Sequence, residues 1–107
     1  MAAWYVTEGY EVIVRNWRCP RGELDIVAWR NNVLVVCEVK ARRNADFGDP
    51  FESFTPRKML RVRRATAAFI ASLRDNQAGA TVPPVREVRF DAAAVIGVRV
   101  ELRENVI

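Results

Sequence analysis

Apolar and polar residues alternate along the first third of the chain. In residues 10–17 (YEVIVRNW) apolar residues at positions 10, 12 and 14 alternate with mostly polar ones, a period of two that is typical of a strand with one buried face. Residues 23–29 predict a second strand, and residues 33–39 (VLVVCEV) a third that is apolar on both faces for most of its length. A strand buried on both faces belongs in the middle of a sheet. Between these two strands, Asn31 and Asn32 tolerate the positive backbone angles of a tight hairpin.

The middle of the chain changes to a helical spacing. Thr55 is expected to cap a helix, and Pro56 suits the first helical position. Apolar residues then recur at spacings of three and four, which predicts an amphipathic helix of about 18 residues. They are Met59, Val62, Ala65, Phe69, Ile70 and Leu73. Residues 42–54 are polar and contain Gly48 and Pro50, which predicts a loop near the sheet edge.

Shorter elements complete the pattern at both ends. Residues 2–8 resemble the end of a helix, which Gly9 terminates. Residues 76–84 predict a loop, and residues 85–95 and 98–103 predict two strands joined around Gly97. The predicted order is α-β-β-β-α-β-β, an α/β fold with a mixed sheet of about five strands flanked by helices. One domain over residues 1–107 suits this length.

Composition narrows the class of protein. The chain has 17 basic and 13 acidic residues, a net charge of +4, and all but two of its basic residues are arginines. The planar guanidinium suits phosphate oxygens, so a polyanionic partner fits, although the charge alone does not require one. No apolar run reaches the ~18 residues of a membrane span, which predicts a soluble, cytoplasmic protein without a membrane partner. Cys19 and Cys37, in a chain without histidine, are expected to be reduced thiols and not zinc ligands.

The predicted hairpin brings four ionisable residues together. A turn centred between residues 31 and 32 pairs residues whose numbers add to 63, as 30 and 33 do. Asp25 then lies opposite Glu38, and Glu23 lies opposite Lys40. Because side chains alternate across a strand, all four are expected on one face, with paired Cβ atoms about 5 Å apart.

This pattern suggests phosphodiester chemistry. Two facing carboxylates repel unless a cation or a shared proton lies between them, so Asp25 and Glu38 are expected to hold Mg²⁺ or Mn²⁺, with the Val39 carbonyl as a further ligand. Lys40 is expected to position a water molecule or stabilise developing negative charge, with Glu23 in support. The alternative is an ordinary ion pair between Glu23 and Lys40 beside two solvated carboxylates.

A basic track accompanies this cluster along the predicted helix. The residues expected to bind nucleic acid are Arg42, Arg43, Lys58, Arg61 and Arg64, with Arg57 beside them. Lys58 is the best single candidate, since a helix N-terminus also offers free N–H groups to a phosphate. The alternative interpretation of the track is a solvated helix face. The aromatic residues are assigned to packing: Trp4, Tyr5, Trp17 and Trp29.

The segments GELDIVA, CEVKARR, FGDPFES, TPRK and RFDAAAV resemble the YraN-like family of bacterial proteins over nearly the whole chain. That family is identified as a member of the PD-(D/E)XK nuclease superfamily, similar in layout to archaeal Holliday-junction resolvases. The resemblance implies a restriction-endonuclease-like fold, metal binding at Asp25 and Glu38, and a catalytic Lys40. It suggests a homodimer, by analogy with the resolvases. In the RFD segment, Phe90 is expected to pack and Asp91 to orient a neighbouring arginine.

One departure from the family pattern concerns the first helix. In the family this helix begins further upstream and carries a glutamate, which has no counterpart here. The N-terminal helix is therefore expected to be truncated, or the site to lack one acidic group, which would weaken metal affinity. Three hypotheses follow: a metal-dependent endonuclease acting on DNA, including branched or flapped DNA; a nucleic-acid-binding module without efficient catalysis; and a protein that only binds other subunits.

Overall fold

The computed structural model describes residues 1–43, 48–75 and 84–106. In this part of the chain the helices are α1 (Ala2–Thr7), the short 3-10 helix η1 (Pro50–Ser53) and α2 (Pro56–Asp75). The strands are β1 (Glu11–Cys19), β2 (Gly22–Arg30), β3 (Val33–Arg42), β4 (Glu87–Ile96) and β5 (Arg99–Arg103). The predicted order of elements is confirmed.

The five strands form one mixed sheet in the order β1-β2-β3-β4-β5. Only β3 and β4 run parallel, and the other neighbouring pairs are antiparallel. The apolar strand β3 lies in the middle, as predicted. Asn31 and Asn32 close the β2–β3 hairpin with φ angles of 50° and 67°, so the sequence signal for this turn was correct.

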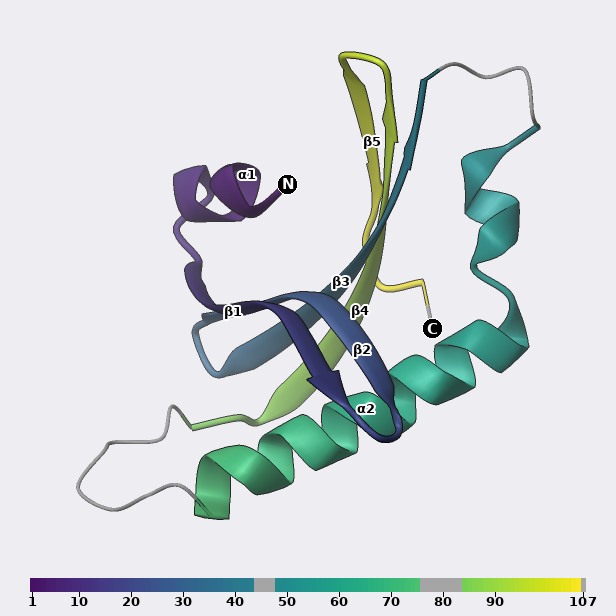
Figure 1. Ribbon diagram of the computed structural model, residues 1–107. Helices are drawn as coiled ribbons and strands as arrows, with labels where there is room; N and C mark the ends of the chain where they lie inside the picture. Colours follow the sequence, from purple (N-terminus) through teal and green to yellow (C-terminus); the bar gives the residue numbers. More distant parts are fainter. Residues whose placement is uncertain (44–47, 76–83, 107) are drawn as a thin grey trace.

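Each face of the sheet has its own apolar core. On one face, α2 contributes Met59, Val62, Ala65 and Phe69, which pack against residues including Leu24 and Val36. The other face is covered in part by the short α1, whose Tyr5 packs with Ile26, Val35 and Cys37. Figure 1 shows α2 running across the sheet and α1 above its opposite side. Thr55 Oγ1 accepts a hydrogen bond from the Lys58 N–H at 3.2 Å, so the predicted helix cap is present.

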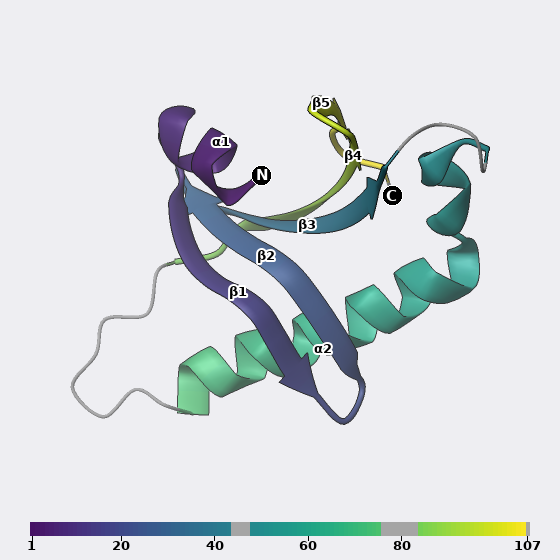
Figure 2. The ribbon, with the colours of Figure 1, turned by 45° about the horizontal axis from the view of Figure 1, so that its top comes forward.

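The β1–β2 hairpin leaves the plane of the sheet at its far end. The β2–β3 pairing follows the predicted register from Arg30–Val33 to Ile26–Cys37 and stops there. Beyond this point β2 bends away from β3 toward α2 (Figure 2). Gly22, at the start of β2, lies close to the α2 backbone: a Cβ atom at this position would be 3.6 Å from the Arg61 carbonyl oxygen. The sheet therefore opens into a fork between β2 and β3, facing the first turns of α2.

The segment between β3 and α2 departs from its prediction as a loop. Strand β3 continues to Arg42, and residues 50–53 form η1. Phe51 of η1 is buried against Ala92 and Ala94 of β4, because alanine leaves room for an aromatic ring over the sheet. The prediction of a loop at the sheet edge was wrong for η1. Most of the loop predicted between α2 and β4 lies outside the described residues.

No helix of the described residues is long and apolar enough to cross a membrane.

Candidate active site

Asp25 and Glu38 lie where β2 and β3 separate, and each side chain bonds the other strand. The Asp25 N–H donates to Glu38 Oε2 at 3.2 Å, and the Val39 N–H donates to Asp25 Oδ2 at 2.8 Å. These reciprocal bonds take the place of the ladder, which ends one pair earlier. Since backbone N–H groups hold both carboxylates, the two side chains are fixed beside each other.

The regular alternation of side chains slips at this point of β2. Leu24 and Val27 are three positions apart, so on a regular strand their side chains would point to opposite faces, yet both pack into the core against α2. On β1, Asn16 stands between the partners of Leu24 and Ile26 and has a φ of 53°. This local irregularity in two neighbouring strands places Asp25 at the fork.

The environment of Glu38 favours its neutral form. The side chain is only 4% exposed. Burial and the nearby charge of Asp25 raise the pKa of Glu38 to about 7, although the Asp25 N–H and the Lys58 ammonium act in the opposite direction. A carboxylate pair under such repulsion is stabilised by any cation that enters between its members.

The fork opens into a hollow of about 460 Å³ with an acidic floor and a basic wall. The predicted residues Glu23, Asp25, Glu38, Val39 and Lys40 line one side. The first turns of α2 line the other side with Thr55, Arg57, Lys58 and Arg61. A ligand that carries phosphate would meet carboxylates and cations together.

The remaining predicted residues lie outside this hollow. Arg42 is half-buried at the end of β3, and Arg43 and Arg64 are exposed. Glu23 makes its ion pair with Arg18, at 3.6 Å, and not with Lys40. The ordinary cross-strand pair considered above is therefore absent from the described residues, because the strands have separated before they reach that position.

The oxygen donors suit a hard divalent cation in kind. Among the described residues, one oxygen of each carboxylate, Asp25 Oδ1 and Glu38 Oε1, accepts no hydrogen bond. Mg²⁺ needs only one or two carboxylates when substrate phosphate and water complete its coordination. The described residues contain no group of three or more acidic, cysteine or histidine side chains that could hold a metal, so a metal ion here would have Asp25 and Glu38 as its side-chain ligands, with the Val39 carbonyl as the further ligand that was predicted.

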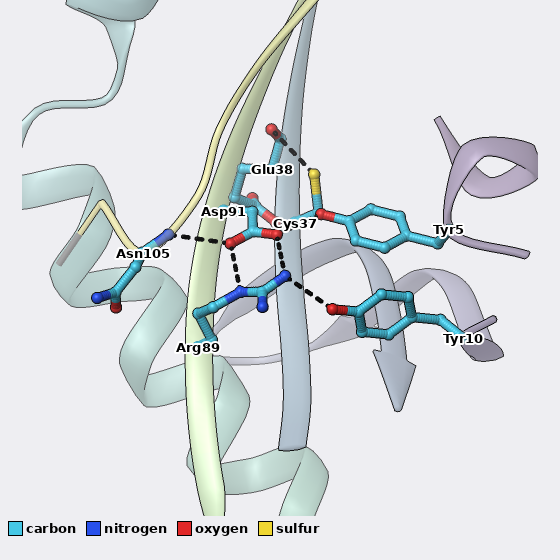
Figure 3. Close-up of polar contacts among 7 residues, drawn as sticks. All are labelled: Tyr5, Tyr10, Cys37, Glu38, Arg89, Asp91 and Asn105. Atoms are coloured by element: carbon cyan, nitrogen blue, oxygen red, sulfur yellow. Dashed lines mark hydrogen bonds and ion pairs between the residues drawn. The ribbon is translucent and has the colours of Figure 1, made fainter. Parts of the chain in front are cut away.

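A second polar cluster was not predicted in full. Asp91 of β4 has no exposed surface and accepts bonds from Tyr5 Oη (2.6 Å), from Arg89 Nε and Nη2 (2.9 and 3.0 Å) and from the Asn105 N–H (3.1 Å). Figure 3 shows Tyr10 joining through Arg89. The expectation that Asp91 orients a neighbouring arginine is confirmed. For the other contacts of this cluster, the only sequence signal was the charged Asp91 within the otherwise apolar residues 90–95.

This cluster, formed by Tyr5, Tyr10, Arg89, Asp91 and Asn105, lies beside the candidate active site. Asp91 is the ladder partner of Cys37, which precedes Glu38. Burial raises the pKa of the Cys37 thiol to about 12, so this thiol stays protonated. The cluster thus fixes α1, β4 and the C-terminal segment around the strand that carries Glu38.

The sequence of the chain matches, over residues 1–95, the family described as "Uncharacterised protein family UPF0102". The chain belongs to the UPF0102 family. This agrees with the resemblance to YraN-like proteins, and the match includes β2, β3 and α2, from which the hollow is built.

Several members of UPF0102 are similar to this chain over most of its length. A UPF0102 protein from Acidothermus cellulolyticus is 45% identical over 92 residues, which cover 84% of this chain and 70% of the relative. One from Beutenbergia cavernae is 46% identical over 96 residues (90% and 75%). One from Phocaeicola vulgatus is 38% identical over 96 residues (90% and 72%).

Proposed function

We propose that this UPF0102 protein is a Mg²⁺- or Mn²⁺-dependent endonuclease-like enzyme that hydrolyses phosphodiester bonds of DNA. The observation that carries the proposal is the hollow between β2, β3 and α2, where the fixed pair Asp25 and Glu38 lies beside Lys40 and opposite Lys58 and Arg61. Carboxylates that bind a hard cation next to cations that bind phosphate are the parts that phosphodiester hydrolysis needs. The nuclease superfamily that the resemblance to YraN-like proteins implies is in keeping with the same assignment.

The residues of the hollow divide into three roles. Asp25 and Glu38 would hold the metal ion, which would supply positive charge next to the phosphate and lower the pKa of a water molecule. Lys40, next to them on β3, orients the attacking water or stabilises the negative charge that develops on the phosphate oxygens. Lys58 and Arg61 on α2 bind the phosphates of the DNA backbone and hold the strand over the carboxylates.

The experiment is a cleavage assay on linear duplex, single-stranded, flapped and four-way DNA, with Mg²⁺, with Mn²⁺ and with EDTA. We expect cleavage that depends on the metal, and a loss of at least about 100-fold in Glu38→Gln and in Lys40→Ala, since each removes a charge used in the transition state. Glu11→Gln, at an exposed position on β1, is the matched control and should cleave like the wild type. Equal cleavage by wild type and Glu38→Gln would refute the enzyme.

A second function, a nucleic-acid-binding module without efficient catalysis, is favoured by one observation. Two carboxylates are one acidic group fewer than the YraN-like pattern implies, because that pattern adds a glutamate on the first helix, and the described residues supply no third one to the pair. This module would bind DNA with an affinity that falls in salt and in Arg61→Ala, and would not cleave with either metal. Arg74→Ala, at the exposed end of the same helix, is the control and should bind like the wild type.

A further inference from the structure

Strand β5 forms one edge of the sheet, and the β4–β5 hairpin has exposed apolar side chains. Within the described residues, β5 pairs only with β4. Val98 in the turn is fully exposed (104%), and Val100 is 50% exposed. The hairpin of β4 and β5 extends beyond α1 (Figure 1). An edge strand with unpaired backbone groups and apolar side chains is a template for another strand.

The hairpin geometry identifies which backbone groups of β5 are free. Only Gly97 and Val98 lie between the paired residues Ile96 and Arg99, and Gly97 has a φ of 61°. In a two-residue hairpin this closing pair exchanges its hydrogen bonds, and the ladder then alternates. Arg99, Glu101 and Arg103 therefore bond β4, whereas the N–H and C=O groups of Val100 and Leu102 point away from the sheet.

We propose that β5 pairs antiparallel with β5 of a second copy of this chain, with the two-fold axis at Val100. In this register Val100 faces Val100 of the partner and Val98 faces the partner's Leu102, so the outward backbone groups meet their complements. Arg99 faces the partner's Glu101 at a position without hydrogen bonds, where opposed side chains lie closest. The two sheets become one continuous sheet.

Charge selects this register over its neighbours. A pair centred on Glu101 would also bring the outward groups of Val100 and the partner's Leu102 together, but it would set two glutamates against each other and Arg99 against the partner's Arg103. A pair centred on Leu102 would set Val100 against Glu104 and needs Arg103 to be free. Arg103 is engaged within its own chain, since its guanidinium lies 3.7 Å from the centroid of the Phe51 ring.

The side chains of the proposed register are available. Arg99 and Glu101 are 63% and 46% exposed and meet each other only at 3.6 Å. An interface of one short strand pair lies at the lower end of stable interfaces, so we expect a dimer with a dissociation constant in the micromolar range. The opposite edge, β1, is less suited, because its register shifts between Val12 and Val14.

Sedimentation velocity over a wide range of concentrations, in EDTA and without nucleic acid, tests this interface. The wild type should show a monomer–dimer equilibrium, which Val100→Lys weakens at least about 10-fold because it sets two like charges on the axis. Val6→Lys is the matched control: Val6 is 59% exposed on α1, away from β5, and its substitution should leave the equilibrium unchanged. Each variant is first confirmed as folded by its urea-unfolding midpoint.

A charge exchange tests the register itself. Arg99→Glu and Glu101→Arg should each weaken the dimer, and the double variant should restore it, since the exchange recreates both ion pairs across the axis. A wild type that is monomeric at every concentration overturns the proposal. So does a dimer that Val100→Lys leaves unchanged, or single charge variants whose effects add in the double variant.

Discussion

Glu38 has the most strongly perturbed environment of the acidic residues at the candidate active site. Its folded-state pKa of about 7 lies above the ordinary value of 4.5, because the carboxyl group is buried beside Asp25. In the folded protein this group therefore keeps a proton at pH values at which the unfolded chain has lost it. Without metal, the contribution of Glu38 to stability should be complete below about pH 4.5 and be lost as the pH rises through 7.

The first prediction measures this effect by urea unfolding in EDTA between pH 5 and pH 8. The free energy of unfolding should fall by up to about 3 kcal/mol over this range, since each pKa unit corresponds to about 1.4 kcal/mol. Glu38→Gln should remove most of the slope, and Glu11→Gln should keep it. A slope that is the same in Glu38→Gln and in the wild type would show that the pH dependence originates elsewhere.

The second prediction concerns the buried hydroxyl of Tyr5. Tyr5→Phe removes the donor that lies 2.6 Å from Asp91 Oδ2 and leaves a carboxylate without exposed surface short of one bond. Urea unfolding should show a loss of about 1–3 kcal/mol. The matched control is Tyr10→Phe, which loses a longer bond of 3.2 Å with the half-buried Arg89 and should cost less. Equal losses in the two variants would contradict the importance given to Asp91.

At the scale of elements, the cap of α2 matters because the basic wall of the hollow starts there. Thr55→Ala removes the hydroxyl that accepts from the Lys58 N–H and should lower stability by about 1 kcal/mol. Thr55→Ser keeps the hydroxyl and should stay close to the wild type. Thermal unfolding of the three proteins distinguishes these outcomes, and an alanine variant as stable as the serine variant would mean that the cap contributes nothing.

The elements that the sequence predicted are those with local signals. Asn31 and Asn32 adopt positive φ angles easily and thereby set the register of β2 against β3, and the spacing from Met59 to Phe69 identifies the buried side of α2. These patterns needed no knowledge of distant residues. The approach of Asp25 to Glu38 therefore followed from counting along one hairpin, whereas the expected pairing of Glu23 with Lys40 failed because the strands separate before it.

The remaining features depend on contacts between distant parts of the chain. The ladder ends at Ile26–Cys37 because the β1–β2 hairpin bends toward α2, and no property of residues 22–42 alone shows this. The bond between Tyr5 and Asp91 joins residues 86 positions apart. Likewise, η1 forms where Phe51 can pack on the alanines of β4. The loop signal of Gly48 was correct, since Gly48 lies outside η1 with a φ of 89°, whereas Pro50 occupies the first position of η1.

At the scale of the whole molecule, the bend of the β1–β2 hairpin decides where charge gathers. It opens the sheet at Asp25 and Glu38 and brings the fork against the first turns of α2. The acidic pair is thereby placed next to cations from a distant segment, although the net charge of the chain is only +4. The arrangement of charge, more than its total, determines the affinity for a polyanion.

The last prediction tests this arrangement through salt. The basic residues of the hollow and the adjoining track (Lys40, Arg42, Arg43, Arg57, Lys58, Arg61 and Arg64) suffice to neutralise about six phosphates, so the affinity for duplex DNA should fall by about 10³ between about 50 and 200 mM salt. Fluorescence anisotropy in EDTA measures binding without cleavage.

Arg61→Ala, which removes a cation from the wall of the hollow, should reduce the slope of log affinity against log salt by about 1. Arg74→Ala removes the same charge from the far end of α2 and should leave the slope unchanged, because that end lies away from the hollow. If both variants lower the slope equally, DNA binding depends only on the net charge of the protein, and the hollow does not position the DNA.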